Sequence, residues 1–190
     1  MRKAFLIIGL AAAFTLAVLA ASAAAPANFA GSWSLDKSKS QGLSQRMQGA
    51  DSVSWTITQD EKTISIDQKV TGGQPPAGGP PGGRSGSGVG GGVGGGRGMG
   101  GPQTYNLDGT ETTSDIGGGQ MTGKASLKAT WSASTLELLR KTTFNGPNGE
   151  VTSTNSQKLS LSGDGKVLTA VVHSESPRGT QDSTLVFNKQ

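Results

Sequence analysis

The 190-residue chain contains no cysteine and only one histidine, His173. Without cysteine there is no disulfide to stabilise the fold and no thiol nucleophile, and a zinc site built from cysteine and histidine is excluded. No G-x-S-x-G motif points to a serine nucleophile, and the thirteen acidic residues are scattered without a distinguished pair for acid–base catalysis. These absences predict a protein that is not an enzyme and that binds no metal or cofactor.

Charge of either sign is sparse, because charged residues make up 16% of the chain. The net charge of +4 includes Arg2 and Lys3 at the N-terminus, and Arg84 and Arg97 in a glycine-rich segment. The rest of the chain is therefore neutral. Nucleic-acid binding needs clustered basic side chains, commonly with aromatic residues between them. We expect no nucleic-acid partner.

Long apolar runs are absent except at the N-terminus, where Ala4–Ala20 follows a short basic start and precedes small residues. This order is typical of a cleavable signal peptide, residues 1–23. Cleavage after Ala23 is favoured over cleavage after Ala25, which would leave Pro26 next to the cut. The alternative is a permanent anchor, but the run is short for a membrane span of about 20 residues. We expect an extracytoplasmic protein, periplasmic or secreted, without a transmembrane anchor after cleavage.

The segment Gly72–Gly101 is of low complexity, with glycine, proline and serine and almost no apolar residue. Such a segment cannot bury enough surface to offset the entropy of ordering it. Because loop closure costs little even for long loops, a stable domain tolerates it as an insertion. We therefore expect one domain over residues 27–190 with a disordered loop at 72–101, in preference to two domains joined by a linker.

Apolar and polar residues alternate over most of the remaining chain, which is typical of half-buried strands. A turn at Asp60-Glu61 would pair Ile57 with Ile64 and Trp55 with Ile66 on one face. Asp-Gly dipeptides favour tight hairpins. They occur at residues 108–109 and at residues 164–165, where the hairpin would pair Leu161 with Leu168.

About eight to ten short strands follow from this pattern, mostly joined by hairpins. The one helix expected is a turn or two within Ser40–Gln48. An antiparallel up-and-down meander closed into a barrel removes exposed strand edges, so we expect an all-β barrel. A β-sandwich is the alternative.

Several motifs resemble those of a known family. Gly31-Ser32-Trp33, continuing to Asp36, resembles the G-x-W opening of lipocalin-like (calycin) barrels. The chain more closely resembles a group of small secreted bacterial lipocalin-like proteins of unknown function. Besides the G-x-W opening, the stretches that match this group are Tyr105–Glu111, Leu161–Thr169, and Trp131 followed by Leu136. The resemblance implies a barrel fold and no particular activity, because one fold serves many functions. The glycine-rich insertion departs from the family pattern.

One hairpin, formed by residues 135–162 around Asn145–Gly149, carries the candidate binding site. If Phe144 faces Val151, alternation places five polar residues on the face that also carries Leu136 and Leu159. These residues are Arg140, Thr142, Ser153, Asn155 and Gln157. A buried arginine is costly unless it is paired, hydrated or bound to an anion. The pattern predicts a small apolar or amphipathic ligand whose acidic head group binds Arg140.

Three aromatic residues are expected to form flat apolar walls for this ligand: Trp55, Tyr105 and Trp131. Two alternatives remain open for the polar residues. A β-bulge would turn them toward water, or Glu111 or Glu137 would pair with Arg140. The second functional hypothesis is an envelope or secreted interaction module with a filled barrel, which contacts protein or polysaccharide through its loops.

Overall fold

The computed structural model describes residues 26–72, 101–118, 121–146 and 149–190. The expected signal peptide and all but the two end residues of the glycine-rich insertion lie outside these ranges. The described residues form one antiparallel sheet of ten strands and one short helix, α1. Their bounds are β1 Gly31–Leu35, α1 Gln45–Gly49, β2 Ser52–Gln59, β3 Thr63–Thr71, β4 Gln103–Asn106, β5 Thr112–Gly118, β6 Met121–Ser132, β7 Thr135–Gly146, β8 Gly149–Leu161, β9 Val167–Ser176 and β10 Gly179–Lys189.

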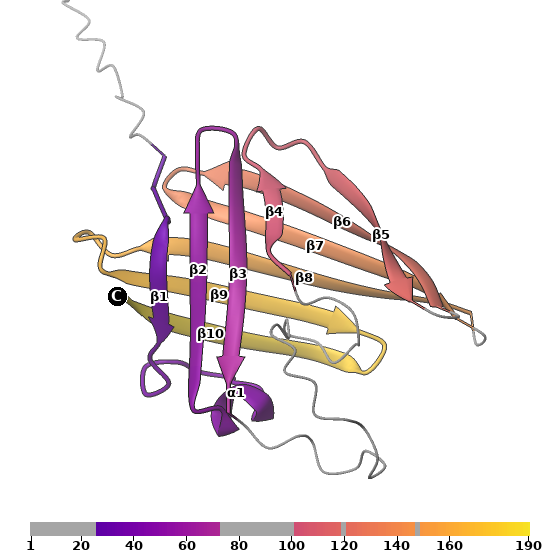
Figure 1. The fold of residues 1–190 in the computed structure, drawn as a ribbon, viewed down its shortest axis with the longest axis horizontal. Helices are drawn as coiled ribbons and strands as arrows, with labels where there is room; N and C mark the ends of the chain where they lie inside the picture. The colour runs from indigo at the N-terminus through magenta and orange to yellow at the C-terminus, as the bar shows by residue number, and fades with distance from the viewer. Residues whose placement is uncertain (1–25, 73–100, 119–120, 147–148) are drawn as a thin grey trace, which may run out of the picture.

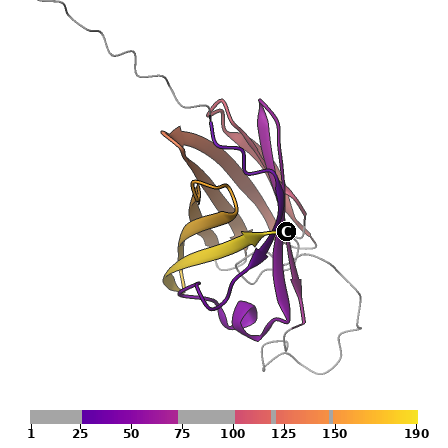
Figure 2. The same cartoon turned by 90° about the vertical axis from the view of Figure 1, so that its left-hand side faces the viewer.

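The sheet curls into a nearly closed barrel (Figures 1 and 2). Its strand order is β4-β3-β2-β1-β10-β9-β8-β7-β6-β5, so β1 pairs with β10 and the two edges are β4 and β5. In Figure 1, β1–β4 cross in front of β6–β10, and β4 comes into contact with β6. The expectation of an all-β, lipocalin-like barrel is confirmed, and the single continuous sheet argues against a sandwich.

Alternation along the strands divides the side chains into an inner and an outer face. Inner-face residues from strands along the whole described chain form the core, which holds the fold together without disulfides because burial of apolar surface is the main stabilising term. The largest fully buried side chains are Trp33, Trp55, Tyr105, Phe29, Phe187, Ile57, Ile64, Leu136, Leu138, Leu159, Leu168 and Leu185.

One end of the barrel is filled by aromatic side chains around Trp33. The indole Nε1 of Trp33 donates a hydrogen bond to the carbonyl oxygen of Phe29 at 2.9 Å, and Lys189 Nζ lies 5.3 Å from the centroid of the Trp33 ring. Phe29 in turn stacks on Trp131 at 6.1 Å between ring centroids. We call this end of the barrel the closed end.

The hairpin between β2 and β3 differs from the expectation by two residues. Ile57 pairs with Ile66 and Trp55 pairs with Gln68, because the turn is centred on Glu61-Lys62 and not on Asp60-Glu61. The Oδ1 of Asp60 accepts hydrogen bonds from the backbone N–H groups of Lys62 and Thr63, at 2.8 and 2.6 Å. A one-residue shift of the turn moves the register by two, so the inner face keeps its residues.

One further expectation was wrong. The Asp108-Gly109 turn does not form a hairpin, because β4 and β5, which it connects, are the two edges of the sheet. The helix is a single short one, as expected: it begins after Ser44, whose hydroxyl caps it, and ends at Gly49, one residue beyond the predicted range. The hairpin at Asp164-Gly165 also pairs Leu161 with Leu168 as expected.

Neighbouring leucines of β7 provide a test of this division into faces. Leu138 is 1% exposed, whereas Leu139 is 42% exposed. We expect Leu138→Ala to lower the free energy of unfolding by about 2–5 kcal/mol, because a buried cavity remains. Leu139→Ala should change it by about 0.5 kcal/mol or less. Urea denaturation of both variants measures the difference, and similar losses for the two would contradict the assignment of faces.

Candidate functional site

The ladder between β7 and β8 is unbroken. Leu136 pairs with Leu159, Arg140 with Asn155 and Thr142 with Ser153, and the register continues to the pair Phe144–Val151. This is the predicted register, and no bulge interrupts it between residues 136 and 146. The alternative in which a bulge turns the polar residues toward water is therefore wrong.

Five polar side chains consequently lie on the inner face beyond the core leucines. All are half-buried, and we call them the inner polar band: Arg140, Thr142, Ser153, Asn155 and Gln157. Gln157 Nε2 donates to Asn155 Oδ1 at 2.9 Å, and Asn155 Nδ2 donates to Ser174 Oγ of β9 at 2.7 Å. The hydroxyl of Thr142 lies 3.4 Å from the carbonyl oxygen of Ser153. These contacts hold the two amides of the band in fixed orientations.

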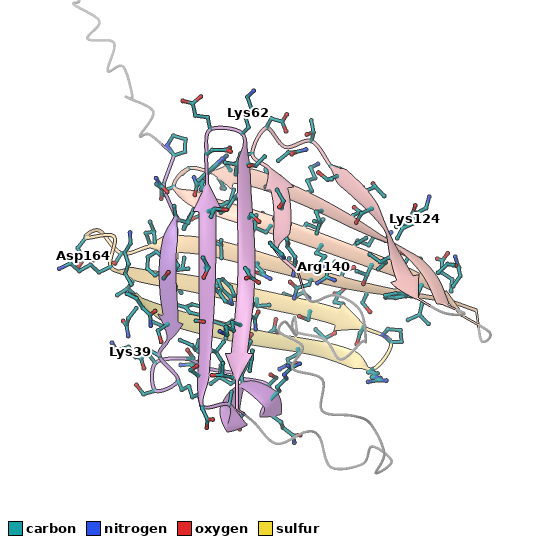
Figure 3. The ribbon with its side chains drawn as sticks, in the orientation of Figure 1. Lys39, Lys62, Lys124, Arg140 and Asp164 are labelled. Carbon is teal, nitrogen blue, oxygen red and sulfur yellow. The ribbon has the colours of Figure 1, made fainter. Side chains whose placement is uncertain are left out.

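Arg140 interacts across the barrel with Tyr105 of β4. Burial lowers the pKa of Arg140, while Tyr105 raises it, and the guanidinium remains charged at neutral pH. Burial raises the pKa of Tyr105 to about 12, against a lowering effect of Arg140. The phenol donates to Gln103 Oε1 at 3.1 Å. In Figure 3, Arg140 lies near the centre of the molecule beside β4, whereas the other labelled charged residues lie at its periphery.

Negative charge is confined to the outer face of the described strands. Glu137 alternates outward and pairs with Lys158 at 2.9 Å, and Glu111 is exposed before β5. Alternation places the other acidic strand residues outward as well. They are Asp67, Asp115, Glu150, Glu175 and Asp182. The acidic side chains of the described strands therefore lie on the opposite face of the sheet from Arg140.

The structure places the three predicted aromatic walls differently. Trp55 and Tyr105 are buried on the inner face of β2 and β4. Trp131 is half-buried at the closed end, where it pairs with Leu136, four residues along β7 from Arg140. The structure therefore brings Tyr105 to the inner polar band and leaves Trp131 away from it.

Sequence reasoning missed apolar groups that accompany the band. Val70 and Leu127 are half-buried on the same inner face, beside Phe144, which the predicted register already placed there. Phe144 lies over Gly123 of β6, where a Cβ would come within 2.7 Å of Phe144 Cδ1. The sequence signal for this contact was the glycine itself, since glycine inside a strand marks the close approach of another group. Ser174 and Gln103 were missed as well, although alternation from Val172 and Tyr105 places both inward.

Trp55 carries a polar atom without a partner among the described residues. Its ring packs against Phe187 at 4.4 Å between centroids, and its buried Nε1 makes no hydrogen bond there. An unsatisfied buried donor costs about 1–3 kcal/mol, and few such groups occur in native structures. Trp33, one strand away, has its indole N–H satisfied by Phe29.

His173 lies mid-strand on the exposed outer face of β9, between two carboxylates. Its Nδ1 is 2.6 Å from Asp182 Oδ1, and its Nε2 is 3.2 Å from Glu175 Oε1. Hydrogen bonding to Asp182, and then to Glu175, raises the pKa of His173. Within the described residues, no group of three metal-ligating side chains is placed to hold a metal ion. The described residues also include no helix that is long and apolar enough to cross a membrane.

Comparison with known proteins adds one similar structure. The sequence matches no protein-family model and no curated protein. The crystal structure of the zebrafish ileal bile acid-binding protein complexed with cholic acid is similar, with a TM-score of 0.45 and 15% sequence identity over 85% of this chain and 98% of that chain. The description of the fold as a calycin-like barrel rests on the strand order and register given above.

The His173 cluster makes stability depend on pH. Because the pKa of His173 is raised in the folded state, its contribution is fully present below the unfolded pKa near 6.5 and is lost as pH rises through the folded pKa. We expect His173→Gln to destabilise the protein more at about pH 5.5 than at about pH 9. Urea denaturation at both pH values measures this, and an equal loss at the two would exclude a linked protonation.

Proposed function

We propose that this protein is an exported, non-catalytic carrier that binds a small amphipathic molecule with an acidic head group inside the barrel. The observation that carries the proposal is the unbroken β7–β8 ladder, which directs Arg140 inward. A guanidinium forms strong charge-assisted hydrogen bonds with a carboxylate or similar anion. The inner face offers this anion no competing carboxylate from the described strands.

The inner polar band and its neighbours match the two parts of such a ligand. Arg140, the Tyr105 hydroxyl and the amides of Asn155 and Gln157 supply polar contacts for a head group. Val70, Leu127 and Phe144 supply apolar surface for the remainder. Sites for small molecules generally combine apolar walls with a few oriented polar groups.

Export is proposed from the N-terminal sequence. A basic start, the apolar run Ala4–Ala20 and the small residues up to Ala25 support secretion out of the cytoplasm, into the periplasm or the medium. We expect the protein recovered from its host to lack residues 1–23. Intact-mass measurement and N-terminal sequencing check this, and a full-length chain retained in the cytoplasm or membrane would contradict export.

The second candidate is an envelope or secreted interaction module that contacts protein or polysaccharide through its loops. The filled closed end favours it, because large side chains such as Trp33, Trp55 and Phe187 occupy much of the interior. Native mass spectrometry of the purified protein discriminates between the two. A stoichiometric co-purifying amphiphile supports the carrier, whereas a ligand-free mass and no response to a lipid panel support the module.

Arg140 and its exposed neighbour Lys141 form a matched pair for testing the carrier. We expect Arg140→Met to weaken oleate binding about tenfold or more, because a charge-assisted hydrogen bond is worth about 1.5–3 kcal/mol. Lys141→Met removes an outward charge from the same strand and should change the affinity about twofold or less.

Titration of tryptophan fluorescence with oleate and with methyl oleate provides the measurement. Methyl oleate should bind wild type and Arg140→Met with the same affinity, because it carries no charge for Arg140. If Arg140→Met bound oleate as tightly as wild type, the anchoring role of Arg140 would be excluded.

A further inference from the structure

Trp33 and Trp55 lie directly opposite one another on β1 and β2, yet only one indole N–H has an acceptor. Trp33 donates to the Phe29 carbonyl oxygen at 2.9 Å, whereas Trp55 Nε1 is buried without a partner among the described residues. An indole N–H can only donate, so only an acceptor atom placed beside it can satisfy this group. Buried tryptophan N–H groups usually find a partner.

We propose that Trp55 determines specificity, and that the ligand carries an oxygen acceptor on its apolar body that receives the Trp55 N–H. This inference rests on the proposed carrier function and names the ligand class more closely: a long-chain acid with a carbonyl or hydroxyl along the chain. The acidic end binds at Arg140, and the second oxygen binds at Trp55.

The sheet places the two polar points at a distance that selects an extended ligand. Trp55 of β2 pairs with Gln68 of β3. Tyr105 of β4, which lies near Arg140, pairs with Ile64, four residues away on β3. On ideal sheet spacing, Trp55 and Tyr105 are then roughly 17 Å apart between Cα atoms. A long chain that lies along the inner face of β3 spans such a separation.

The surroundings of Trp55 make the discrimination strong. Its ring lies against Phe187, at 4.4 Å between centroids and 35° between ring planes, within an otherwise apolar cluster. A ligand without an acceptor leaves the N–H unsatisfied, as it is in the ligand-free barrel. A ligand with an acceptor gains the hydrogen bond without breaking another one, and it reaches the buried N–H by displacing apolar side chains packed around Trp55. Sites with buried polar groups discriminate well against analogues that leave those groups unpaired.

Keto acids derived from stearic acid test this proposal against stearate itself. The carbonyl is placed near the head group, at mid-chain or near the tail, and binding is measured by calorimetry. We expect wild type to bind at least one keto isomer about tenfold more tightly than stearate, the effect of one buried hydrogen bond. Trp55→Phe should abolish this preference, because phenylalanine keeps an aromatic ring and lacks the N–H donor.

Trp33→Phe and Trp131→Phe are the matched controls, and both should retain the preference. If wild type binds stearate but prefers no keto isomer, or if Trp55→Phe keeps the preference, the role of Trp55 is overturned while the carrier function stands. If wild type binds none of the acids, the carrier function itself fails.

A measurement on wild type covers the case in which Trp55→Phe does not fold. The chain has three tryptophans, so NMR shows three indole N–H signals, and the two control variants assign the third to Trp55 by elimination. The preferred keto acid should shift the Trp55 signal downfield and slow its hydrogen exchange, whereas stearate should not. Equal effects of the two ligands on this signal would overturn the proposal.

Discussion

The uninterrupted antiparallel ladder from β6 to β9 is the constraint on which the rest of the structure depends. In such a ladder the side chains alternate strictly, so fixing one inward residue fixes every other along the strand. Once Leu136 and Leu159 are buried, Arg140 and Asn155 must also point into the barrel. The fold thus carries polar groups inward as a direct consequence of burying leucines on the same strands.

The two ends of the barrel meet opposite requirements. A domain without disulfides depends on apolar burial for its stability, and the closed end supplies this through Trp33, Phe187 and their neighbours. Beyond the core leucines, the inner face becomes half-buried and polar. Half-buried polar groups add less to stability than tightly packed apolar side chains, and here they are confined to one part of the sheet.

The sequence predicts those parts of the fold that depend on short patterns along the chain, such as strand alternation and turn dipeptides. The β7–β8 register follows from alternation over more than ten residues on each strand, and the pair Leu161–Leu168 follows from an Asp-Gly turn. The β2–β3 register was wrong by two because Asp60 caps a turn one residue later than expected. The edge position of β4 and β5 depends on contacts between distant parts of the chain, which no local pattern encodes. The contact of Phe29 with Trp131 at the closed end and the proximity of Arg140 to Tyr105 depend on the same curvature.

Arg140 and the Trp55 indole are both costly to bury, but for different reasons. The guanidinium loses hydration on burial, which lowers the pKa of Arg140. The indole loses a hydrogen bond that no described residue replaces. A sequence selected for stability alone would favour phenylalanine at position 55, since it packs against Phe187 without an unsatisfied donor. Neither group is explained by folding stability alone, and both lie on the inner face, where the proposed ligand with two polar points would contact them.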